Sequence, residues 1–187
     1  MADAYSLTAI SQEDDTENDD EDRKFLKDFI LERNWQGGGS YFSFYGVVKE
    51  TARQDRPLKV AGIEYHSPGY IEMVGDANVL ERVVNSIEAF RRQGDVLEPI
   101  YKSIYGVLKK ERLLRASRDT PLSSDALNKF VVEQSIKLAS MVGLPEPEHL
   151  LRASNRNVVV FAKVILSFTR RIRDLAVFYE EGRVSAA

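Results

Sequence analysis

The chain has 187 residues, of which 43% are hydrophobic and 29% charged, and these ordinary values exclude wholesale disorder. It contains no cysteine, which excludes thiol nucleophiles, structural disulfides and cysteine-based zinc sites. A chain of this length can bury a hydrophobic core without disulfides or bound metal, either as one domain or as a small domain with a helical extension.

The net charge of −3 conceals an uneven distribution of charge. Residues 1–22 hold nine acidic and no basic residues, whereas residues 23–187 hold the other 20 acidic and all 26 basic ones, a net charge of +6. The acidic segment either keeps the protein soluble or covers a basic face and competes with an anionic partner. It lacks the glycine and the final glutamate of a calcium-binding loop, so we expect no calcium site there.

No membrane or secretion signal is apparent. The first four residues lack the basic and apolar regions of a secretory signal, and the long apolar run at residues 158–168 is interrupted by Lys163. We therefore expect a soluble, cytoplasmic protein with no membrane association.

The amino-terminal half is predicted to alternate between strand and helix. Alternating apolar and small polar residues at 4–11 predict a short strand, with a frayed terminus as the alternative. An acid-rich start predicts a helix at about 20–34. The Gly-rich breaker 37–40 leads into an aromatic and β-branched run at 41–48, which predicts a second strand.

Two further strands are predicted at residues 59–66 and 70–74, joined through Ser67-Pro68-Gly69. Glu64, His66 and Glu72 could converge across this hairpin to hold a cation or share a proton, although the solvated outer face of a hairpin explains the same residues.

Helices account for the remainder of the chain. Asp76 is predicted to cap a helix that ends at Gly94, and Asp95 a second helix with Pro99 in its first turn. Ser124 is predicted to cap a third helix that ends at Gly143. A final helix is predicted over residues 157–181.

This order of elements predicts an α+β fold with a small antiparallel sheet of three to four strands, which resembles an incomplete ferredoxin-like unit with helices on one face. We divide the chain into an acidic segment at 1–22, an α+β unit at 23–118, and a helical hairpin at 119–187 that packs on this unit or belongs to the same domain.

The final helix carries an apolar stripe with alternating spacings of three and four, which requires a partner helix. The stripe on the preceding helix has compatible spacing, so an antiparallel hairpin within the chain explains the pattern, and pairing between chains is the alternative. The candidate interface residues, called here the terminal stripe, are Phe161, Ile165, Phe168, Ile172, Leu175 and Tyr179.

Two basic clusters are candidates for binding nucleic-acid phosphates, which requires only grouped Lys and Arg side chains. The clusters consist of Lys109, Lys110, Arg112 and Arg115, and of Arg170, Arg171 and Arg173.

The sequence contains no motif typical of nucleophilic catalysis, phosphate binding or metal ligation, and no cofactor is expected. The leading hypothesis is a non-enzymatic protein-interaction or oligomerisation module that acts through its final helix, with another protein or a second copy as partner. The alternative is a nucleic-acid-binding protein whose basic clusters are modulated by the acidic segment.

Overall fold

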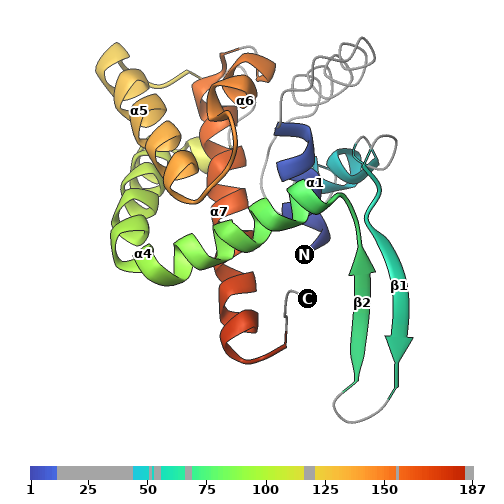
Figure 1. The fold of residues 1–187 in the computed structure, drawn as a ribbon. Helices are drawn as coiled ribbons and strands as arrows, with labels where there is room; N and C mark the ends of the chain where they lie inside the picture. Colours follow the sequence, from blue (N-terminus) through green and yellow to red (C-terminus); the bar gives the residue numbers. More distant parts are fainter. Residues whose placement is uncertain are drawn as a thin grey trace.

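The structure, a computed structural model, consists largely of helices in the part of the chain that it describes. The described residues are 1–11, 44–50, 52, 56–65, 69–115, 121–154 and 156–183. The elements, shown in Figure 1, are α1 (Ala2–Ser11), a helical segment at 44–50, β1 (Lys59–Glu64), β2 (Tyr70–Val74), α4 (Ala77–Lys110), the 3-10 helix η1 (Leu113–Arg115), α5 (Asp125–Met141), α6 (Pro147–Ala153) and α7 (Val158–Glu180).

Helix α7 runs through the middle of the helical body, with α4 crossing it and α5, α6 and α1 arranged around it (Figure 1). Every residue from 159 to 169 is buried, and the later turns bury one side only. An apolar helix surrounded on all sides by other helices is the natural centre of a core, because each of its faces removes apolar surface from water.

Two predicted strands were wrong. Residues 4–11 lie in α1, and residues 44–48 lie in the helical segment 44–50. Nearly all of α1 is buried, so its sequence carries no one-sided helical pattern for the periodicity to reveal. In the second segment Phe44, Tyr45 and Val48 are buried, a helical spacing whose tertiary packing overrides the strand propensity of aromatic residues.

Among the described residues the sheet is therefore a single antiparallel pair, β1 with β2, rather than three or four strands. This pair confirms the two strands predicted on either side of residues 67–69. The helix predicted at 20–34 lies outside the described residues.

Most of the predicted helix boundaries in the carboxy-terminal half are confirmed. The side chains of Asp76, Ser124 and Asn157 each accept a hydrogen bond from a backbone N–H in the first turn of the helix that follows. Gly143 ends α5 with a φ of +81°, a backbone conformation that glycine adopts without strain. The short helix α6 was not predicted.

The two helices predicted on either side of Gly94 form the single element α4. The backbone leaves helical geometry at Gln93, with φ −125° and ψ 16°, and α4 bends there (Figure 1). Pro99 lies inside α4, in the second turn after Gln93 rather than in a first turn, and Asp95, predicted as a cap, also lies inside α4. The predicted break is thus a kink rather than a loop.

Helix α1 fixes the root of the hairpin, where β2 turns into α4. The hydroxyl oxygen of Tyr5 accepts a hydrogen bond from the backbone N–H of Asp76 at 2.8 Å, and the Tyr5 ring lies against Gly75. A Cβ at position 75 would lie 2.8 Å from that hydroxyl and 2.9 Å from ring carbons, so only glycine fits without displacement.

Gly75→Ala should lower the free energy of unfolding by roughly 1–3 kcal/mol, because the new methyl group must displace a buried tyrosine. The matched control is Gly106→Ala in α4, where a Cβ would meet nothing within 4 Å. That variant should raise the free energy of unfolding by roughly 0.5–1 kcal/mol through helix propensity. Urea denaturation measures both, and equal effects of the two variants would contradict the tight contact at Gly75.

Candidate interaction surface

The terminal stripe lies inside the helical body. Phe161, Ile165, Phe168 and Ile172 have no exposed surface, Leu175 is 5% exposed, and Tyr179 is half-buried. Because α4 and α5 already cover α7, these side chains do not present an open surface to a second chain.

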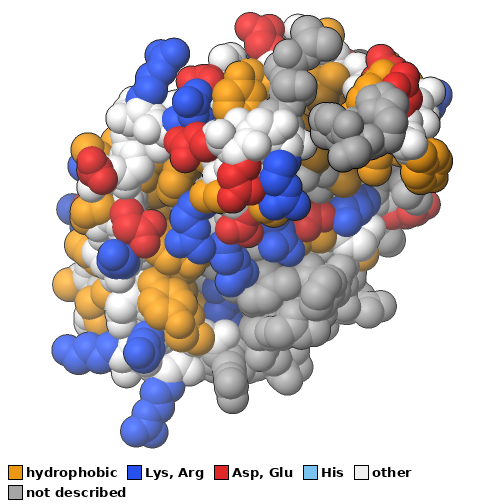
Figure 2. Space-filling view, turned by 90° about the horizontal axis from the view of Figure 1, so that it is seen from below, with side chains coloured by type: hydrophobic (Ala, Val, Ile, Leu, Met, Phe, Trp, Pro, Cys, Tyr) orange, Lys and Arg blue, Asp and Glu red, His pale blue; other side chains and the backbone are white. Residues whose placement is uncertain are grey.

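The arginines of α7 take part in contacts within the chain. Arg171 donates from Nε to Asp3 at 2.9 Å and lies over the ring of Tyr45. Arg173 approaches Glu98 at 3.8 Å. Arg170 is half-buried, with its Nε inside the protein. Figure 2 shows the molecule from below, where Lys and Arg side chains gather near the middle of the face with Asp and Glu side chains among them.

The other predicted basic cluster lies at the end of α4. Lys109, Lys110 and Arg112 are exposed, whereas the side chain of Arg115 is not among those described. Lys109 and Lys110 occupy the last turn of α4, where positive charge is stabilised by the negative end of the helix dipole. Helix stabilisation therefore accounts for these two lysines without a ligand.

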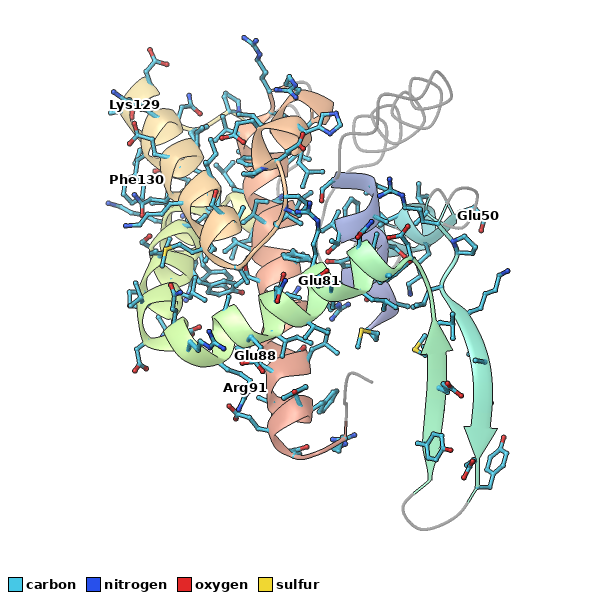
Figure 3. The ribbon with its side chains drawn as sticks, in the orientation of Figure 1. Glu50, Glu81, Glu88, Arg91, Lys129 and Phe130 are labelled. Carbon is cyan, nitrogen blue, oxygen red and sulfur yellow. The ribbon has the colours of Figure 1, made fainter. Side chains whose placement is uncertain are left out.

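Paired charges of this kind recur on the outward side of α4. Glu88 and Arg91, labelled in Figure 3, form an ion pair of 2.8 Å, and Arg91 also approaches Glu180 of α7 at 3.5 Å. Mixed charge of this type suits a solvated surface and gives no single-sign field for a polyanion.

The hairpin of β1 and β2 stands away from the helical body and is exposed along its length (Figures 1 and 3). Its register contains a bulge: Val60 pairs with Met73 and Gly62 pairs with Glu72, which leaves Ala61 as the extra residue in β1. A bulge shifts the alternation of side chains by one position. Val60 and Ile63, on either side of the bulge, therefore lie on the same face, whereas in a regular strand two residues three positions apart lie on opposite faces.

The bulge produces a hairpin with one apolar face. Cross-strand partners lie on the same face of a sheet, so the pairs Val60–Met73 and Ile63–Ile71 form a continuous apolar surface. Val60, Ile63 and Ile71 are 55%, 48% and 62% exposed. We call these four residues the apolar face.

The opposite face is mainly polar and carries Lys59, Glu64, Tyr70 and Glu72, with Val74 at its root. The Tyr70 hydroxyl donates a hydrogen bond to Glu64, which raises the pKa of Tyr70. Glu64 and Glu72 thus share a face, a point that the sequence left open, while His66 lies outside the described residues. Across the described chain no three His, Asp or Glu side chains are grouped closely enough to hold a metal ion.

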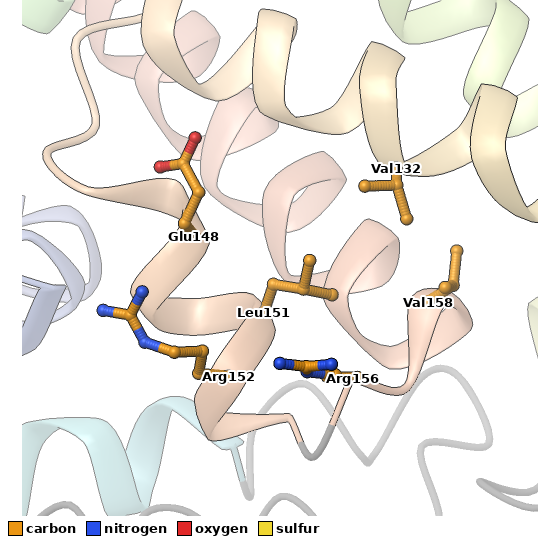
Figure 4. Close-up of a pocket in the computed structure, with 6 residues that line it drawn as sticks. All are labelled: Val132, Glu148, Leu151, Arg152, Arg156 and Val158. Carbon is orange, nitrogen blue, oxygen red and sulfur yellow. The ribbon is translucent and has the colours of Figure 1, made fainter.

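A hollow of about 420 Å³ opens between α5, α6 and the start of α7 (Figure 4). Three aliphatic and three charged side chains line it: Val132, Leu151, Val158, Glu148, Arg152 and Arg156. Guanidinium groups beside aliphatic side chains are suited to binding an amphiphilic anion. The lining residues include no histidine, hydroxyl or thiol that could act as a catalytic base or nucleophile on such a ligand.

Sequence reasoning treated Lys163 only as an interruption of an apolar run. The structure places it in the second turn of α7 with 2% of its surface exposed, and burial lowers its pKa from 10.5 to about 8. Burial in an apolar region disfavours the charged form of an amine. The protein therefore holds a lysine whose charge opposes folding at neutral pH.

The free energy of unfolding should rise as the pH increases above about 8, because between that value and 10.5 the unfolded chain binds the Lys163 proton more tightly than the native one. The rise should be visible below pH 10. Above pH 10 it is opposed, because tyrosine at position 45 begins to ionise in the unfolded chain while Tyr45, with a pKa raised to about 12, stays neutral in the native state. Thermal unfolding across this pH range measures the slope.

Lys163→Met should flatten that slope, whereas Lys129→Met, which changes a lysine whose side chain is 79% exposed, should leave it intact. A slope that persists in the Lys163 variant would assign the pH dependence to another group.

Comparison of the sequence with protein-family models and with curated proteins, and of the structure with solved structures, gave no match. Within the described part of the chain, no helix combines the length and the apolar character needed to cross a membrane.

Proposed function

We propose that the chain is a non-enzymatic self-association module, and that the β1–β2 hairpin is its contact surface. The observation that carries this proposal is the apolar face, where Val60, Ile63 and Ile71 are each about half exposed on an arm that projects from the helical body (Figure 1). Contiguous exposed apolar surface is characteristic of interaction sites.

The proposal keeps the interaction role predicted from the sequence but moves it from α7 to the hairpin. The terminal stripe is covered by α4 and α5, so its apolar surface is already removed from water. The apolar face of the hairpin is not covered in the same way. A new contact there gains hydrophobic free energy that α7 has already gained inside the chain.

The stability of the hairpin also supports a role in assembly. A two-stranded ribbon is only marginally stable in water, and a sheet with an apolar face needs three or more strands or a packing partner. Both strands are exposed here, and the sheet has only these two strands among the described residues. An additional strand from another molecule would supply what the ribbon lacks.

A second copy of the chain is the partner that the hairpin fits best. Most soluble assemblies are symmetric homo-oligomers, and a two-fold contact uses the same surface on both molecules. Such a surface must be complementary to itself. Strand β1 meets this condition, because it carries opposite charges at its two ends, Lys59 and Glu64, with the β-branched residues Val60 and Ile63 between them.

Ile63→Asp should weaken self-association of the full chain by roughly tenfold or more, because it places a charge in the apolar contact. Sedimentation equilibrium over a wide range of protein concentrations measures the effect. The position is 48% exposed in the single chain, so the melting temperature of the dilute protein should change little.

Val96→Asp is the matched control, since Val96 is a β-branched residue of α4, outside the hairpin, that is 53% exposed. It should leave self-association unchanged. A wild-type chain that remains monomeric at every concentration would refute the proposal, as would equal losses in the two variants.

A further inference from the structure

The segment from Leu58 to Tyr65, which contains β1, is complementary to itself when read in opposite directions. Residues at equal distances from its centre are matched in character: two apolar residues at the ends, then two opposite charges, then two β-branched residues, then two small ones. The matched pairs are Leu58 with Tyr65, Lys59 with Glu64, Val60 with Ile63, and Ala61 with Gly62.

This symmetry also holds for the two faces of the strand. The bulge at Ala61 brings Val60 and Ile63 to the apolar face, and it leaves Lys59 and Glu64 together on the polar face. If β1 were regular, residues three apart would lie on opposite faces, and the matched pairs could not meet side by side. A bulge on an edge strand usually discourages pairing. Here it lies at the centre of the repeat, where Ala61 and Gly62 have the smallest side chains.

The outer edge of β1 is placed so that a second molecule can reach it. Figure 1 shows β2 on the side of the hairpin nearer the helical body and β1 on the outside. In the described residues β1 pairs with β2 alone. A two-fold rotation about an axis perpendicular to the hairpin, beside β1, would carry the second helical body to the opposite side, away from the first.

We propose that β1 pairs antiparallel with β1 of a second copy, in the register that sets Lys59 against Glu64 and Val60 against Ile63. This inference rests on the proposed self-association and adds the edge and the register. The product is a four-stranded sheet in the order β2, β1, β1, β2, with two Lys59–Glu64 pairs related by symmetry. A four-stranded sheet has the size that a lone hairpin lacks.

The register also accounts for the most exposed aromatic side chain of the hairpin. Tyr65, 91% exposed at the end of β1, would meet Leu58 of the second copy. Leu58 is partly buried against the core of its own chain. Each hairpin tip is thereby carried to the root of the other hairpin, beside the other helical body.

Charge reversal tests the register. Lys59→Glu and Glu64→Lys should each weaken self-association by roughly tenfold or more, because each creates two symmetric pairs of like charge across the strands. An equimolar mixture of the two variants should associate as tightly as the wild type, since both contacts are then between opposite charges. The double variant in one chain should also associate as the wild type does. Glu72→Lys, on the polar face of β2 away from this edge, is the control and should have no effect.

Disulfide trapping gives a second, independent readout, because the natural chain has no cysteine. A mixture of Val60→Cys and Ile63→Cys chains should form a cross-linked heterodimer much faster than either chain alone, since directly opposed Cβ atoms lie within disulfide range. Val60→Cys mixed with Ile71→Cys is the control and should cross-link slowly.

The outcomes separate this inference from the proposed function. Restored association in the mixed charge variants together with the 60–63 cross-link would support the register. Self-association that is lost in Ile63→Asp but unaffected by charge reversal, or cross-linking that is equal in all mixtures, would overturn the register and leave the proposed function standing. A chain that is monomeric throughout would overturn both.

Discussion

The fold depends on the burial of α7. Each large apolar side chain from residue 159 to residue 168 is buried on whichever side it points, at a gain of roughly 1.5–3 kcal/mol per residue. No single neighbour could do this, so α4, α5, α6 and α1 must all be arranged around it. This burial is extensive enough to include Lys163, whose amine would otherwise remain in water.

The polar contacts of the body follow from that arrangement. Where α7 emerges from the core, Arg171 binds Asp3 of α1, and Asp3 also binds Lys49 at 2.6 Å. One carboxylate thus joins α1, the 44–50 helix and α7. Ser167 donates a hydrogen bond to the hydroxyl of buried Tyr45 at 3.1 Å, which ties the same segments together deeper in the protein. Through Asp3, Arg171 thus links α7 to α1 and to the 44–50 helix.

The sequence predicted those features of the fold that depend on local chemistry. Asp76 and Ser124 cap helices as predicted, because capping needs only one oxygen at the right offset from the first turn. The cap at Asn157 was not predicted. The strands predicted at residues 4–11 and 44–48 were wrong. A fully buried helix shows no polar face in its sequence, and tertiary packing decides the structure of an aromatic segment. The terminal stripe was recognised as a packing surface, but the identity of its partner depends on tertiary contacts that no local pattern encodes.

The candidate surface was harder to predict for a related reason. The residue types predict both strands of the hairpin. The apolar face, however, depends on the bulge at Ala61, and the position of this bulge is set by the pairing of β1 with β2, which the sequence of β1 alone does not reveal. Regular alternation would have spread Val60 and Ile63 over two faces and left neither face distinctly apolar. The bulge gathers them on one side, and against the described part of the chain both remain about half exposed. Folding of the described part of the chain leaves this apolar surface in water, so covering it would gain hydrophobic free energy that folding has not already gained.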